Sequence, residues 1–93
     1  MTRVPAAILI TGASAGLGQA LALAYAAPGV TLFLGALDAQ PLQAVAAACR
    51  AQGAVAIERV LDVRDRAAMA DWIAACDGTA GLDLVIANAG ISA

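Results

Sequence analysis

The residues best suited to chemistry in this 93-residue chain lie near its start, between Thr11 and Gly18. The run Thr-Gly-Ala-Ser-Ala-Gly-Leu-Gly follows an apolar segment and leads into a helical pattern. Its glycines allow a tight backbone turn and a close approach to a ligand, and the start of a helix offers unpaired N–H groups and a positive dipole end. A diphosphate suits both features. A Walker phosphate loop is excluded, because no lysine follows the last glycine.

Two further short motifs place polar side chains after apolar segments, namely Asp62-Val63 and Asn88-Ala89-Gly90. Each also has a purely structural interpretation, since Asp, Asn and Gly are common turn residues. Ser14 has one as well, because serine often caps a helix. Neither a metal site nor a redox-active cysteine pair is indicated: the chain has no histidine, and its two cysteines form no Cys-x-x-Cys pair.

The segments that must position these motifs alternate between two kinds. Short apolar runs, most of them apolar on consecutive residues as expected for strands covered on both faces, predict strands over Ala6–Thr11, Val30–Gly35, Ala54–Leu61 and Leu82–Ala89. The patterns between them predict helices over Gly16–Ala27, Ala39–Gln52 and Arg66–Asp77, the last with Asp65 as its N-cap.

This alternation predicts one α/β domain of the three-layer, Rossmann-like kind, with a parallel sheet of about four strands in the order 3-2-1-4. The first two helices should cover one face and the third helix the other. Cys49 and Cys76 would then lie on opposite faces, unable to form a disulfide. In the first helix, Leu17, Leu21 and Tyr25 recur every four residues and are expected to face the core.

Taken together, the motifs resemble the short-chain dehydrogenase/reductase family: Thr-Gly-x-x-x-Gly-x-Gly at residues 11–18, Asp62-Val63 after the third strand and Asn88-Ala89-Gly90 after the fourth. The resemblance covers nearly the whole chain. It implies that the pyrophosphate and adenosine ribose of a bound dinucleotide are lined by Gly12, Ser14, Gly16, Leu17 and Gly18.

For the other two motifs, the resemblance implies that Asp62 accepts from the adenine amino group, beside the backbone of Val63. Asn88, Ala89 and Gly90 would border the cofactor ribose, and Asn88 would also tie the fourth strand to the first near Thr11. All three motifs follow predicted strands, and ligands of open α/β sheets bind at the carboxyl ends of strands.

The cofactor implied is NAD or NADP. The family commonly distinguishes them just after the second strand, by an acid or by an arginine, but Gly35 and Ala36 occupy these positions. Asp38 lies about 20 residues past Gly18, as expected for a ribose-binding acid. Its place between a strand and a helix favours an N-cap instead. The choice stays open, with a slight lean to NADP.

The reaction implied is hydride transfer between a nicotinamide and a carbonyl or alcohol substrate. Its proton relay, a Ser followed by Tyr-x-x-x-Lys, is expected after the Asn-Ala-Gly turn, and the chain has no lysine. Tyr25 is expected to pack in the core, and Ser92 has no His or Lys to activate it, so no catalytic residue is assigned. We therefore expect residues 1–93 to be a partial NAD(P)-binding domain of an oxidoreductase, lacking the catalytic second half and inactive alone.

Composition limits the partners and the location. The chain is 62% hydrophobic with a net charge of -2, which argues against disorder and against binding to nucleic acid or to anionic membrane. The short first apolar run disfavours a signal peptide. No apolar stretch is long enough for a membrane span. The cysteines are expected to be buried and reduced, which favours a cytoplasmic location. The apolar fourth strand, at an open sheet edge, predicts self-association.

Two other functions stay open. One is a stand-alone nucleotide-binding or regulatory module, which would bind a nucleotide without turnover. The other is a truncated pseudo-enzyme whose remaining property is pairing along the fourth strand.

Overall fold

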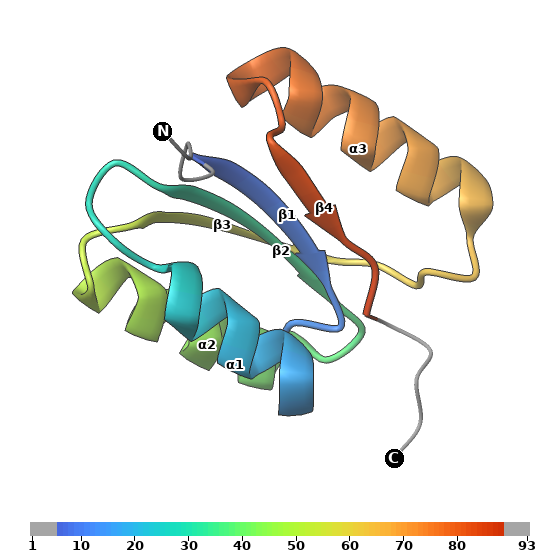
Figure 1. Ribbon diagram of the computed structural model, residues 1–93. Coiled ribbons are helices and arrows are strands. Elements are labelled where there is room, and N and C mark those ends of the chain that lie inside the picture. The colour runs from blue at the N-terminus through green and yellow to red at the C-terminus, as the bar shows by residue number, and fades with distance from the viewer. Residues whose placement is uncertain (1–5, 89–93) are drawn as a thin grey trace.

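A computed structural model describes residues 6–88, in which strands and helices alternate along the chain (Figure 1). The strands are β1 (Ala7–Thr11), β2 (Thr31–Ala36), β3 (Val55–Val60) and β4 (Leu84–Ile86), and the helices are α1 (Gly16–Tyr25), α2 (Ala39–Ala51) and α3 (Arg66–Ala80). The strands pair in parallel in the order β3-β2-β1-β4. The predicted fold class and strand order are confirmed.

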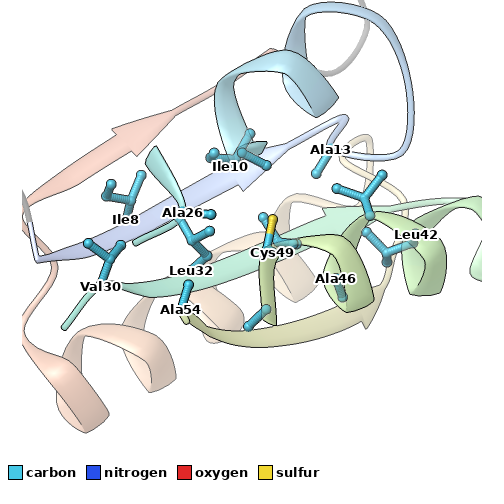
Figure 2. Packing of buried hydrophobic residues seen from close by; sticks show 14 of the residues in the cluster. Ile8, Ile10, Ala13, Ala26, Val30, Leu32, Leu42, Ala46, Cys49 and Ala54 are labelled. Carbon is cyan, nitrogen blue, oxygen red and sulfur yellow. The ribbon is translucent and has the colours of Figure 1, made fainter. Parts of the chain in front are cut away.

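The sheet is the middle of three layers, with α1 and α2 on one face and α3 on the other (Figure 1). Figure 2 shows the larger core, where Ile8 and Leu32 of the sheet meet Cys49 of α2. The smaller core, around Trp72 and Cys76, lies under α3. The two cysteines are free and on opposite faces of the sheet, as predicted.

The buried face of α1 differs from the prediction. Leu17 is 61% exposed, while the helix buries Gly18 and Ala22. Small residues on this face let the helix axis approach β1 closely, so the longer side chains are turned toward its margins. Leu21 and Tyr25 are only partly buried there, at the edge of the core.

The outer strands are less covered than the sequence suggested. β1 is buried along its whole length, but Val55 and Ile57 of β3 are 56% and 44% exposed, and Val85 of β4 is 44% exposed. The prediction that strands are covered on both faces is therefore wrong for β3 and β4, because α3 covers only the middle of its face. None of the helices within residues 6–88 is long and apolar enough to cross a membrane.

Aspartate side chains fix the starts of α3 and β4. Asp65 caps α3 as predicted, accepting the Ala68 N–H at 3.0 Å. The helix continues three residues beyond the predicted end at Asp77, and Gly81 then adopts a left-handed conformation. Asp83 holds the start of β4 against β1, because its carboxylate accepts the backbone N–H of Ala7 at 3.0 Å.

Candidate functional site

A cleft of about 810 Å³ opens at the carboxyl ends of the strands. Its walls come from the loops that follow β1, β2 and β3 and from Asn88 after β4. Of the site residues predicted from the sequence, eight line this cleft, namely Gly12, Ser14, Gly16, Leu17, Ala36, Asp62, Val63 and Asn88. The topology thus brings together residues from four separate loops, which is what parallel strands joined by crossover helices produce.

The glycine-rich turn forms the wall of the cleft beside α1. Gly12 and Gly16 have positive φ angles of 63° and 58°, a conformation that side chains other than glycine rarely adopt. The Ala13 N–H donates to the carbonyl of Gly35 at 3.1 Å, which fixes the turn to the end of β2. These contacts hold the start of α1 at the cleft.

The first turn of α1 has no side-chain cap. Ala15 occupies the N-cap position and makes no capping hydrogen bond, so the structural interpretation of Ser14 as the cap is wrong. Both residues line the cleft instead. The first N–H groups of a helix have no partner within the helix, and here they lie next to a cavity large enough for a nucleotide. The arrangement can bind an anion.

Two of the predicted glycines lie behind the cleft rather than in its lining. A Cβ on Gly18 would overlap the carbonyl oxygen of Gly12 and lie 2.9 Å from Nδ2 of Asn88. A Cβ on Gly35 would lie 2.7 Å from the indole ring of Trp72. Both positions therefore require glycine for close packing, the first between α1 and the turn and the second between β2 and α3.

Asn88 joins β4 to β1 as the sequence predicted. Its backbone N–H donates to Oγ1 of Thr11 at 3.0 Å, and its side-chain amide contacts the carbonyl of Gly12 at 3.5 Å. The hydroxyl of Thr11 is buried, so this link is shielded from water. Ala89, Gly90 and Ser92 lie outside the described residues, and their roles stay predictions.

The loop after β2 forms the opposite side of the cleft. Beyond Ala36, which offers only a methyl group, come Leu37, which is 60% exposed, and Asp38. Asp38 occupies the N-cap position of α2 as predicted, but its side chain makes no capping hydrogen bond. Asp38 also lines the cleft, where its spacing of about 20 residues from Gly18 had allowed a ribose-binding acid.

The loop after β3 carries an ion pair that the sequence analysis missed. Arg64 donates Nε to Oδ1 of Asp62 at 3.1 Å and Nη2 to Oδ2 at 2.8 Å. The side-chain hydrogen bonds from Arg64, together with its backbone N–H, lower the pKa of Asp62 below its ordinary value, and Asp62 raises the pKa of Arg64. The pairing follows from a separation of only two residues in a turn, which could have been noticed in the sequence.

The described part of the cleft offers few charged groups. Its lining has two carboxylates, Asp38 and Asp62, and one cation, Arg64. No histidine or lysine occurs anywhere in the sequence. Within residues 6–88 there is also no group of three His, Cys, Asp or Glu side chains that could hold a metal ion. Apart from the polar Ser14 and Asn88, the remaining lining is apolar or glycine, as expected for a nucleotide cleft.

Comparison with known proteins gives consistent matches. The family described as short chain dehydrogenase matches residues 6–93. An uncharacterized oxidoreductase of Myxococcus xanthus is 47% identical over 85 residues, covering 89% of this chain and 33% of that protein. A short-chain type dehydrogenase/reductase from Mycobacterium marinum has a TM-score of 0.83 at 34% identity, covering 95% of this chain and 36% of that one.

A third match carries a ligand. A metagenomic short-chain oxidoreductase, solved in complex with NADP, has a TM-score of 0.84 at 30% identity, covering 92% of this chain and 39% of that one. The chain spans at most about a third of the length of the curated relatives it matches, with shares from 14% to 33%.

Proposed function

The chain belongs to the short-chain dehydrogenase family, and from this membership we propose that its cleft binds the adenosine diphosphate half of NAD(P)(H). The protein is then an oxidoreductase that transfers a hydride between the nicotinamide and a carbonyl or alcohol substrate. The observation that carries the proposal is the convergence of predicted residues from four loops on one cleft beside the uncapped start of α1.

The residues present fit such a cofactor. Gly12 and Gly16 leave the turn without side chains where a diphosphate would approach, and the start of α1 would supply N–H donors. Leu17, exposed and lining the cleft, offers apolar area to a sugar or a base. Asp62 and the backbone of Val63 would meet the adenine, in the roles that the family resemblance implies.

The cleft is proposed to accept both NAD(H) and NADP(H), with a slight preference for NADP(H). Ala36 at the end of β2 neither repels a 2′-phosphate nor binds it. Asp38 disfavours the phosphate, while Arg64 and the NADP bound to the metagenomic neighbour favour it. Because these influences oppose each other, dissociation constants for NADH and NADPH are expected to lie within about tenfold of each other.

These 93 residues are proposed to bind the cofactor without turnover. A Tyr-x-x-x-Lys relay cannot be assembled from a sequence that contains no lysine. Of the remaining candidates, Tyr25 packs partly buried against the larger core and is not part of the cleft lining. General acid–base catalysis requires a positioned group of suitable pKa, and the lining described within residues 6–88 contains no His, Lys, Tyr or Cys side chain.

Calorimetric titration of the purified protein tests the proposal. ADP-ribose and NADH should both bind, because each contains the adenosine diphosphate that the cleft would hold. Reduced nicotinamide mononucleotide, which lacks that half, should bind at least about tenfold more weakly. Absence of measurable heat with ADP-ribose at millimolar concentration would remove the basis for the proposed function.

We also propose that the 93-residue chain self-associates when it is isolated. β4 is an edge strand of three residues, paired with β1 alone among the described strands. No strand within residues 6–88 pairs with its outer edge, and its Val85 is 44% exposed, which together favour pairing with a second chain. Size-exclusion chromatography with light scattering should give a species larger than a monomer. A sharp monomeric peak at high concentration would argue against the pairing.

A further inference from the structure

The loop after β3 presents one carboxylate whose hydrogen-bonding capacity is largely used by a neighbouring arginine. Oδ1 of Asp62 accepts the backbone N–H of Arg64 at 2.9 Å, and Oδ2 accepts Nη2 at 2.8 Å. The Nε–H is shared between the two oxygens, at 3.1 Å from Oδ1 and 3.2 Å from Oδ2. A carboxylate has roughly four lone-pair sites. Three N–H groups of one residue therefore leave Asp62 with about one site for any other donor.

The Asp62–Arg64 pair is accessible to a ligand in the cleft. Both residues line the cleft, and the side chain of Arg64 is 83% exposed while that of Asp62 is 33% exposed. Arg64 is the single cation of the described lining. The two side chains have opposite preferences, since a carboxylate only accepts hydrogen bonds and a guanidinium only donates them.

Purine bases differ at position 6 in just this respect. Adenine has an amino group there, which donates to a carboxylate, whereas hypoxanthine has a carbonyl oxygen, which a guanidinium can bind and a carboxylate repels. A free Asp62 would therefore select adenine strongly. When Arg64 is paired with Asp62, the carboxylate prefers adenine over hypoxanthine much less.

We propose that Arg64 is a specificity-determining residue that weakens the preference of this cleft for adenine over hypoxanthine by occupying the carboxylate of Asp62. The inference rests on the proposed function, because it concerns the base of the dinucleotide in the same cleft. The parent protein binds NADH and its hypoxanthine counterpart with dissociation constants within about fivefold of each other. Hydrogen bonds to a free charged group are substantially stronger, so removal of Arg64 raises the adenine preference by about tenfold.

Titration of the purified protein with NADH and with reduced nicotinamide hypoxanthine dinucleotide tests this. Arg64→Leu removes the side-chain donors and keeps comparable apolar bulk. Arg66→Leu is the matched control, because it removes the same charge two residues away, from a position outside the cleft lining. The ratio of the two dissociation constants should rise about tenfold in Arg64→Leu and stay within twofold of the parent in Arg66→Leu.

The double variant Arg64→Leu with Asp62→Asn should not show the rise in adenine preference expected for Arg64→Leu, because the Asn side chain carries no charge. A ratio that is unchanged or lower in Arg64→Leu overturns the inference, because Arg64 would then be neutral or would be orienting Asp62 toward the base. If neither dinucleotide binds to the parent or to any variant, the proposed function itself fails. The two failures are thus distinguished by whether NADH binds at all.

Discussion

Placing an acid at the start of α1 should stabilise the fold and weaken dinucleotide binding at the same time. Ala15 has extended backbone angles (φ -160°, ψ 167°), as an N-cap residue requires, but no side chain that can accept a hydrogen bond. Ala15→Asp supplies one. The gain in the free energy of unfolding is expected to be about 1 kcal/mol, from the cap and from the favourable interaction of a carboxylate with the helix dipole.

The same carboxylate would compete with the diphosphate for the first-turn N–H groups and would repel it. At a separation of about 5 Å, each pair of unit charges costs between ~0.8 kcal/mol in water and ~3 kcal/mol at the effective dielectric constant of a protein surface. For an open cleft with two phosphate charges, a total near 2–3 kcal/mol is expected, which is roughly a thirty- to hundredfold loss of affinity.

Two measurements on the purified protein check this prediction: urea unfolding without ligand, and calorimetric titration with ADP-ribose. Ala74→Asp is the control, because Ala74 is exposed on α3 and absent from the cleft lining. It should leave the affinity within twofold and lower the stability by about 0.5 kcal/mol, since Asp is a poorer helix former than Ala. If Ala15→Asp is more stable but binds ADP-ribose within threefold of the parent, the diphosphate does not lie at the start of α1.

Three further outcomes are expected. Gly18→Ala should lower the free energy of unfolding by about 2–3 kcal/mol, because its Cβ would overlap a backbone carbonyl, whereas Gly78→Ala, which meets open space within α3, should raise it by about 0.5 kcal/mol in urea titrations. Asp38→Asn should raise NADPH affinity relative to NADH by about three- to tenfold in calorimetry, since a like charge is removed from the cleft. An NMR titration should place the Asp62 pKa below its ordinary 3.8 and return it toward that value in Arg64→Leu. Because the folded-state pKa is depressed, the stability that this pair contributes is complete above about pH 3.8 and is lost as the pH falls through the depressed pKa.

The elements of this fold were predictable because each one depends on local chemistry. Residues 7–10 are apolar without a break, which favours a buried strand, and Asp65 marked the start of α3 through its capping position. The sequence could not reveal which face of α1 is buried. Leu17, Leu21 and Tyr25 at helical spacing looked like the core face, but the buried face is centred on Gly18 and Ala22, with Leu21 and Tyr25 only at its edge. Close packing favoured small residues over large ones, and hydrophobicity patterns do not detect that choice.

The site was predictable as a set of motifs but not as a set of contacts. The order of strands brings Gly12, Asp62 and Asn88 to one edge of the sheet, so their convergence follows from topology alone. The Asp62–Arg64 pair could have been suspected from its spacing, but its geometry, and the absence of a capping hydrogen bond from Asp38, depend on side-chain conformations. A sequence specifies such conformations only through the full three-dimensional surroundings.

Hydrogen bonds link β4, the shortest strand of the sheet, to the proposed diphosphate site. β4 is held to β1 at its start by Asp83, and at its end by Asn88, which contacts both Thr11 and the carbonyl of Gly12. The carbonyl of Gly12 belongs to the glycine-rich turn itself, and Gly18 of α1 packs against it. Detachment of β4 therefore removes one attachment of the turn that would hold the diphosphate, which is otherwise fixed to the end of β2 by the Ala13–Gly35 hydrogen bond. Conversely, a ligand that binds only the closed turn also stabilises the attachment of β4, because binding to the folded state alone shifts the equilibrium toward it.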